Sequence, residues 1–163
     1  MKPAQCQLVN LLGDRYDVDG YHSLKFDERQ HRGQADGSAF VPAKNLLIPD
    51  WKTLMANPES KANLQKFLAQ CFQEHCEHIP DDTTVILGGM LESSEETVCI
   101  TSMSHSRIDD LACKDHEEAD TRVIAHLAYC ASQLGIPLRS VVHATNTDII
   151  MLCIYQPCNR QHR

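Results

Sequence analysis

The chain has 163 residues, of which 42% are apolar, and its formal net charge is −7. This length is enough for one domain with an ordinary core, and the apolar fraction excludes wholesale disorder. The acidic balance argues against a broad nucleic-acid-binding surface held by charge alone. It does not exclude an enzyme that meets phosphates through metal ions bound to its carboxylates, because such ions invert the local field.

The sequence shows no membrane segment and no secretory signal. No apolar run is long enough to span a bilayer. The first residues lead into Gln7, Asn10 and Asp14 instead of an apolar signal core. We therefore expect no membrane partner and an intracellular protein, in the nucleus or the cytoplasm. The eight cysteines are then expected as reduced thiols and not as a disulfide framework.

The first fifty residues alternate a short apolar segment with polar stretches. Residues 8–12 are mostly apolar and stop at Gly13, which fits either a strand or the end of a helix. Residues 25–32 are dense in charge and fit a solvated loop or arm, although their basic members are also suited to a phosphate backbone. Residues 33–50 contain two glycines and two prolines without a sustained period, so we expect a long loop there.

Residues 51–76 are predicted to be helical. Asn57 followed by Pro58 marks a new start, with Asn57 as the cap and Pro58 at the first helical position. Apolar residues at helical spacing then form one stripe. The members of this stripe are Leu64, Phe67, Leu68, Cys71 and Phe72.

The end of this helix carries four residue types that bind zinc, at Cys71, His75, Cys76 and His78. Cys71 and His75 are spaced i, i+4 and suit a shared ion. Cys71, however, belongs to the apolar stripe, and no second Cys/His pair has the spacing of a zinc ribbon or finger. We therefore expect no zinc. We also expect no nucleotide cofactor, because the Gly-Gly pair at 88–89 precedes no Gly-Lys-Ser/Thr.

β-Branched residues predict two strands in the middle of the chain, over residues 83–87 and 97–101. The glycine pair ends the first strand, and an acidic tip separates it from the second. Residues 102–114 are polar and predicted to form a loop. The rest of the chain has the order helix, strand, loop, helix, which is typical of an α/β sheet whose ligands lie beyond the carboxyl ends of the strands.

The helix that begins at Glu117 is the best-defined element. Gly135 ends it and a strand is expected over residues 138–144. Thr145 or Asn146 is suited to cap a further helix, and residues 156–163 are expected to be a disordered tail. The apolar stripe of the first helix consists of Val123, Ile124, Leu127, Ala128, Ala131 and Leu134.

Acidic residues open both helices. Glu118 and Asp120 fall in the first turn of one, and Asp148 falls in the first turn of the other. Acids at these positions stabilise the helix macrodipole, so the spacing alone does not require a metal site. His126 and His143 are expected as satisfied core or surface histidines and not as parts of a Cys–His hydrolase site.

The combination of these motifs resembles the 5′ nuclease domains of bacterial DNA polymerase I and the flap endonucleases, and more broadly the PIN-like nuclease superfamily. That family has a Glu-Ala-Asp-Asp run, a strand and a Gly-Asp-x-Asp turn. Residues 118–121 (Glu-Ala-Asp-Thr) match the first motif, and residues 145–148 (Thr-Asn-Thr-Asp) fall on the second. Asp19, with basic residues after it, is similar to a strand-ending Asp of the family. The motif at 116–122 (His-Glu-Glu-Ala-Asp-Thr-Arg) is most similar to a motif of uncharacterised animal PIN-like proteins.

The resemblance implies an α/β, partial PIN-like three-layer fold, in which a mainly parallel central sheet is flanked by helices. Residues 1–163 would form a single, incomplete domain. The implied activity is divalent-metal-dependent hydrolysis of phosphodiesters in DNA or RNA, with Mg²⁺ or Mn²⁺ bound to carboxylates. The implied metal ligands are Asp19, Glu118, Asp120, Asp148 and Asn146, and the implied phosphate contacts are Lys25, Arg29 and Arg32.

Two departures from the family weaken the expected activity. Asn146 stands where the family has Asp, and its amide brings no charge to a metal. The family's first strand, which ends in another Asp, is expected to precede this chain, and the family's sheet continues beyond Arg163. Two hypotheses therefore remain: an impaired nuclease, or a non-catalytic PIN-like relic that binds a protein or nucleic acid or has a structural role. The sequence does not predict the oligomeric state or choose between DNA and RNA.

Overall fold

The computed structural model describes residues 7–14, 38–93, 95–112, 119–134, 140–144 and 147–155. The predicted charged segment at 25–32 and the predicted tail at 156–163 lie outside these residues. In chain order the elements are β1 (Leu8–Leu12), α2 (Trp51–Ala56), α3 (Pro58–Glu74), the 3₁₀ turn η1 (Cys76–His78), β2 (Thr84–Gly88), β3 (Thr97–Ile100), β4 (His105–Arg107), the 3₁₀ turn η2 (Asp109–Leu111), α4 (Ala119–Leu134) and α5 (Thr147–Tyr155).

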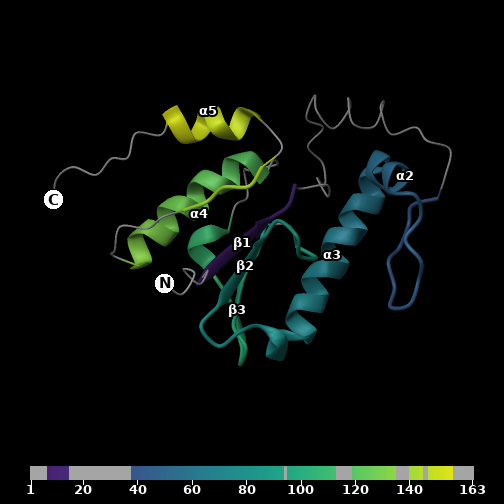
Figure 1. Ribbon diagram of the computed structural model, residues 1–163, viewed down its shortest axis with the longest axis horizontal. Helices are drawn as coiled ribbons and strands as arrows, with labels where there is room; N and C mark the ends of the chain where they lie inside the picture. The colour runs from purple at the N-terminus through teal and green to yellow at the C-terminus, as the bar shows by residue number, and fades with distance from the viewer. Residues whose placement is uncertain are drawn as a thin grey trace, which may run out of the picture.

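The sheet lies between two helices, with α3 on one face, α4 on the other and α5 beside α4 (Figure 1). Alternation of side chains along the strands explains this layering. Val85 and Leu87 of β2 point to the α3 side, where they pack with Ala69. Asn10 of β1 and Gly88 of β2 point to the α4 side, where both meet His126. The mixed α/β class predicted from the sequence is therefore confirmed.

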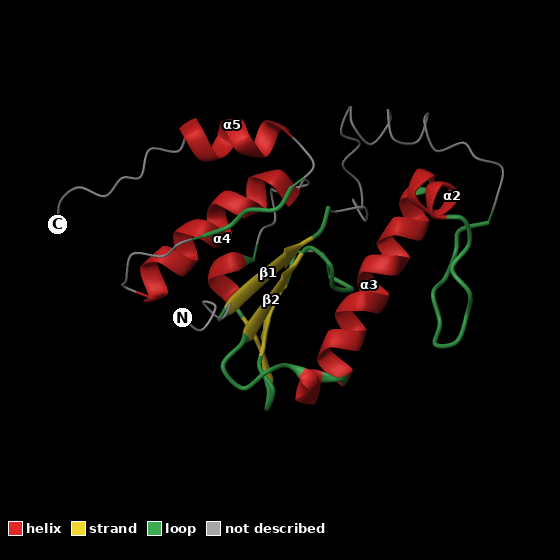
Figure 2. Ribbon diagram, viewed as in Figure 1, coloured by secondary structure: helices red, strands yellow, loops and turns green. Residues whose placement is uncertain are grey.

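The prediction of a mainly parallel sheet is wrong. The four described strands follow the order β1-β2-β3-β4, and only β1 and β2 pair in parallel. The β2–β3 and β3–β4 pairs are antiparallel. The length of the connection between two strands decides whether they can pair in parallel, because parallel neighbours need a crossover of a dozen or more residues. The connection from β1 to β2 contains α2 and α3 (Figure 2), whereas short segments join the later strands.

The predicted loop at 102–114 contains β4 and η2 instead. The turn before β4 is closed by Thr101, whose N–H donates to the carbonyl of Ser104 at 2.8 Å. This turn directs the polar residues of β4 back along β3. Arg107 then pairs with Glu96 at 2.7 Å and with Asp109 at 2.8 Å. Cross-strand contacts therefore impose a strand on residues of low β propensity.

The strand predicted over 138–144 is wrong for its described part. Residues 140–144 form no strand, and Val141 is 85% exposed. A pair of valines favours a strand only where a sheet edge is available for pairing. These residues instead form part of the connection between α4 and α5 (Figure 1).

The helical prediction for 51–76 is confirmed, with a break where the cap signal stands. Asn57 accepts a hydrogen bond from the backbone N–H of Ser60 at 2.9 Å, and Pro58 opens α3. The buried positions of α3 are Ser60 and Ala69, whereas Leu68 of the predicted stripe is exposed. Small residues at the contact allow α3 to lie close to its neighbours.

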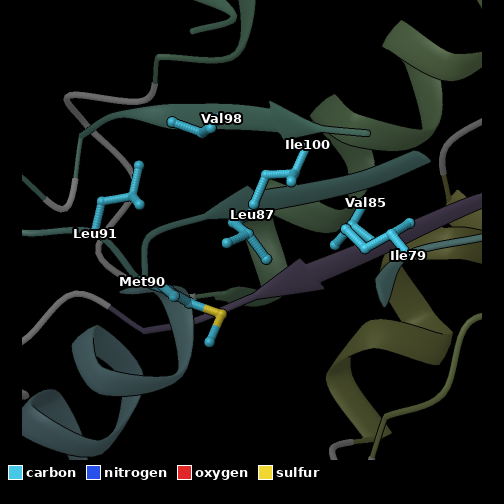
Figure 3. Packing of buried hydrophobic residues seen from close by; sticks show 8 residues of the cluster. Ile79, Val85, Leu87, Met90, Leu91, Val98 and Ile100 are labelled. Atoms are coloured by element: carbon cyan, nitrogen blue, oxygen red, sulfur yellow. The ribbon is translucent and has the colours of Figure 1, made fainter. Parts of the chain in front are cut away.

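The core forms between α3, the sheet and the segment after β2. Leu87 and Ile100 are completely buried at its centre (Figure 3). Val9 and Leu11 of β1 pack against it from the edge of the sheet. The buried members are Ala69, Ile79, Val85, Leu87, Met90, Leu91, Val98 and Ile100. None of the described helices combines the length and the apolar composition that a bilayer crossing requires.

Replacing Gly89 by alanine is expected to destabilise the fold by about 2 kcal/mol or more. Gly89 has a φ of +76°, and a Cβ there would overlap the carbonyl oxygen of Gly13. Urea unfolding measures the effect. The matched control is Gly13→Ala, whose Cβ meets the flexible side chains of Met90 and Gln65, so we expect a smaller loss. Equal losses in the two variants would contradict the proposed backbone constraint.

Candidate functional site

The parallel pair of strands brings two chain segments together at one edge of the sheet. Leu12 is aligned with Gly88, and the N–H of Gly13 donates to the carbonyl of Gly88 at 2.9 Å. The chain therefore leaves β1 and β2 at the same place. In α/β proteins, ligands bind beyond the carboxyl ends of parallel strands. This edge is consequently the candidate functional site of the chain.

Asp14 connects this edge to α4. Its carboxylate oxygen Oδ1 accepts a hydrogen bond from the backbone N–H of Ala119 at 3.0 Å. A carboxylate at this position satisfies an amide at the helix start and interacts favourably with the helix macrodipole. The bond also brings the first turn of α4, which carries Asp120, to the end of β1.

The sequence did not single out Asp14 as a site residue. In the structure a strand, β1, ends at Leu12, and Asp14 follows two residues later. The available signal was the Gly-Asp pair directly after the apolar residues 8–12. Residues 8–12 fit a strand and a helix end equally well, so the sequence does not predict that Asp14 follows a strand.

The predicted site residues are only partly within the described chain. Asp120 is half-buried in the first turn of α4, and Asp148 is exposed in the first turn of α5. These two positions agree with the predicted helix starts. The predicted residues that lie outside the described ones are Asp19, Lys25, Arg29, Arg32, Glu118 and Asn146.

The described carboxylates near this edge do not form a compact metal-binding group. Among the described residues, Asp14, Asp120 and Asp148 do not form a group of three whose ligand atoms lie within 4.8 Å of one another. Carboxylate oxygens are nevertheless the ligands that Mg²⁺ and Mn²⁺ prefer. Asp14 and Asp120 are described carboxylates on the segments that come together at this edge.

The face of α4 that packs on the sheet is polar. Arg122, His126 and Cys130 follow one another at intervals of four residues, and all three are buried. Arg122 is 0% exposed and His126 is 2% exposed. Ala128 of the predicted apolar stripe, in contrast, is exposed. The helix is thus rotated relative to the orientation that its apolar pattern predicts.

Polar groups on β1 complement this face. The ring nitrogen Nδ1 of His126 lies 2.9 Å from Oδ1 of Asn10. The amide nitrogen of Asn10 donates to the sulfur of Cys130 at 3.7 Å. With the amide in this orientation, the imidazole carries its proton on Nδ1. The pair fixes the position of α4 along β1.

Gly88 allows the imidazole of His126 to lie against the sheet. A Cβ at Gly88 would be 3.0 Å from Nε2 of that ring, which is closer than most such contacts. Nε2 is buried and has no hydrogen-bond partner among the described residues. Burial, with a further effect from the guanidinium of Arg122, lowers the pKa of His126 to about 4. The histidine is therefore neutral at neutral pH.

The stability of the protein is expected to decrease as the pH falls from 6.5 towards 4. The pKa of His126 is depressed from 6.5 to about 4. The unfolded chain therefore takes up a proton in this window that the folded chain does not bind. Above pH 6.5 His126 does not lower the free energy of unfolding. Near pH 4 its resistance to protonation in the folded state lowers that free energy by about 3 kcal/mol. Urea unfolding at a series of pH values measures it.

The matched variants are His126→Gln, which removes the buried titrating group, and His105→Gln, which removes an exposed one on β4. The first is expected to flatten the pH dependence within this window, and the second to leave it unchanged. The slope is compared, not the absolute stability, so a destabilised His126 variant remains informative. A measured pKa near 6.5 for His126 in the folded protein would refute the explanation.

Comparison with known proteins returns no match: no family model, no curated protein and no solved structure is significantly similar to the chain.

Proposed function

We propose that the chain is a divalent-metal-dependent, nuclease-like domain whose site lies at the carboxyl ends of β1 and β2. The observation that carries this proposal is the hydrogen bond between Asp14 and the N–H of Ala119. It joins a strand-ending carboxylate to the helix turn that bears Asp120. Two acidic residues from separate parts of the sequence therefore lie on adjoining segments, at the end of the sheet where α/β proteins bind their ligands.

The donor set supports Mg²⁺ or Mn²⁺ as the ion. Mg²⁺ usually keeps several waters and is bound through one or two carboxylates, so Asp14 and Asp120 offer enough charge for a first ion. Glu118, Asp148 and Asp19 belong to the proposed ligand set, and Asn146 would add a neutral oxygen. When bound, such ions would polarise a phosphodiester and activate a water. Asp14 would in addition hold the start of α4 in place.

The proposed assignment to the PIN-like superfamily derives from the acidic motifs at 118–121 and 145–148. Helices on both faces of the sheet are consistent with it, whereas the antiparallel pairing of β3 and β4 differs from the expected sheet. The proposed substrate is DNA or RNA, and the proposed phosphate contacts are the basic residues of segment 25–32. The proposal includes an intracellular location, in the nucleus or the cytoplasm.

Two observations favour a non-catalytic PIN-like domain with a binding or structural role. Asp14, Asp120 and Asp148 form no group of three within 4.8 Å in the described part of the chain. Asp148 is also exposed at the start of α5. A binding or structural role would need only the fold and the contact between Asp14 and α4.

Cleavage of labelled single-stranded and flapped DNA and of single-stranded RNA, with Mn²⁺ or Mg²⁺, tests the proposal. Asp14→Asn and Asp120→Asn are each expected to lower the rate by about a hundredfold or more, because each removes a metal-binding charge. The amide oxygen in the Asp14 variant still accepts from the N–H of Ala119. Its loss of activity would therefore report the lost charge and not a displaced helix.

The matched control is Asp110→Asn, which removes the same charge from an exposed residue of η2. It is expected to retain the full rate. Equal cleavage by the native protein and the Asp120 variant would indicate a contaminating nuclease. A folded native protein that cleaves none of the substrates would refute the catalytic proposal in favour of the non-catalytic one.

A further inference from the structure

The C-terminal end of α3 presents two histidines and a glutamate on one tight turn. His75 follows the helix, and its N–H donates to the carbonyl of Cys71 at 3.0 Å. The N–H of His78 donates to the carbonyl of His75 at 3.1 Å, and the N–H of Ile79 donates to the carbonyl of Cys76 at 2.9 Å. Ile79 belongs to the core and Cys76 packs against it. The backbone of the turn is therefore fixed before any ligand binds.

The 3₁₀ geometry places the two imidazoles on the same side. Such a turn has three residues per revolution, so side chains at i and i+3 are eclipsed. His75 and His78 have this spacing, and their rings are stacked with centroids 6.1 Å apart and planes inclined by 23°. Oε1 of Glu77 lies 3.7 Å from Nδ1 of His75 and 3.7 Å from Nε2 of His78.

We propose that His75, Glu77 and His78 form a surface site for Zn²⁺ or a similar borderline transition-metal ion. One ligand atom from each residue lies within 4.8 Å of the others. Zinc bonds of 2.0–2.1 Å in a tetrahedron separate the ligand atoms by about 3.3 Å. The histidine–carboxylate distances of 3.7 Å thus need to shorten by only a few tenths of an ångström.

The chemistry of the three ligands selects the ion. Two imidazoles and one carboxylate are a known zinc donor set, with a further position left for water. Imidazole ligands suit Zn²⁺, Cu²⁺ and Ni²⁺, whereas Mg²⁺ and Ca²⁺ prefer oxygen ligands alone. The site thus differs in ion and in place from the one proposed at the ends of β1 and β2. It does not depend on the proposed nuclease function.

Charge at the turn also favours a cation. The carboxylate of Glu77 lies against both imidazoles and is the acidic member of the group. The adjacent Glu74 carboxylate is balanced by Lys44, whose Nζ lies 3.3 Å away. Nζ of Lys44 also lies 3.5 Å from Nε2 of His75, so Nδ1, on the side of Glu77, is the ligand atom of His75 in the proposed site. Without metal, Glu77 contacts two exposed histidine rings, and such surface contacts add little stability.

Cys71 and Cys76, whose positions in the sequence suggested a zinc site, are not part of the proposed site. Cys76 packs against the core, and Cys71 is not in the described group of ligands. Glu77 provides the third ligand instead, and no Cys/His spacing rule includes it. The expectation of no zinc was based on the cysteines, and the geometry of η1 gives reason to revise it.

Titration of the ¹⁵N-labelled 163-residue chain with ZnCl₂ tests the proposal, because the amide spectrum locates the ion while the titration gives its affinity. Location matters, since the chain has nine histidines and eight cysteines. We expect saturable shifts in residues 75–78. His78→Gln and Glu77→Gln are each expected to weaken this binding by about tenfold or more. Both side chains are exposed, so the variants are expected to fold.

His105→Gln is the matched control, because His105 is an exposed histidine outside the group. It is expected to bind zinc at 75–78 with unchanged affinity. A second probe is CoCl₂, which should give no thiolate charge-transfer band if these ligands bind it. Three results would each overturn the proposal: shifts confined to other residues, unaltered affinity in the His78 and Glu77 variants, or no saturation. The group would then have only the surface contacts of Glu77 with the two histidines.

Discussion

The parallel pairing of β1 with β2 is the constraint on which the rest of the structure depends. It gives the sheet a strand whose alternate residues serve both layers, since Leu11 packs towards α3 and Asn10 towards α4. It also brings the backbone at Gly13 close to Gly89, where a Cβ would overlap the carbonyl oxygen of Gly13. Asp14 emerges from this close approach, and the start of α4 is held by it. The candidate site therefore results from the strand pairing.

The contact between α4 and β1 includes a polar pair, formed by His126 and Asn10. Arg122 and His126 occupy the face of α4 that an amphipathic helix usually fills with aliphatic side chains. Asn10 provides the hydrogen-bonding group opposite, and Gly88 provides the space. Buried polar groups restrict the orientation of a helix more sharply than aliphatic ones, because each must meet a particular partner. The start of α4 is thereby oriented relative to the strand ends.

Local features were predictable from the sequence, and non-local ones were not. The Asn57 cap, the start of α3 and the strands around Leu87 and Ile100 follow from signals within a few residues. The sense of strand pairing depends on connection length, and the exposure of Val141 depends on which sheet edge is available. For the site, the acidic helix starts were predicted, but Asp14 was not, because its partner is far away in the sequence. The proposed zinc ligands His75, Glu77 and His78 could be identified only from the 3₁₀ geometry of η1.

The long separation of β1 and β2 in the sequence also has a consequence for the order of folding. Closing a long loop costs chain entropy before its contacts form, and contacts between distant residues slow folding. The antiparallel strands β2, β3 and β4 join through short turns and lie close to α3 in the chain. We infer that these elements assemble first and that β1 and α4 dock last. The site at the end of β1 would then become complete only in the final step of folding.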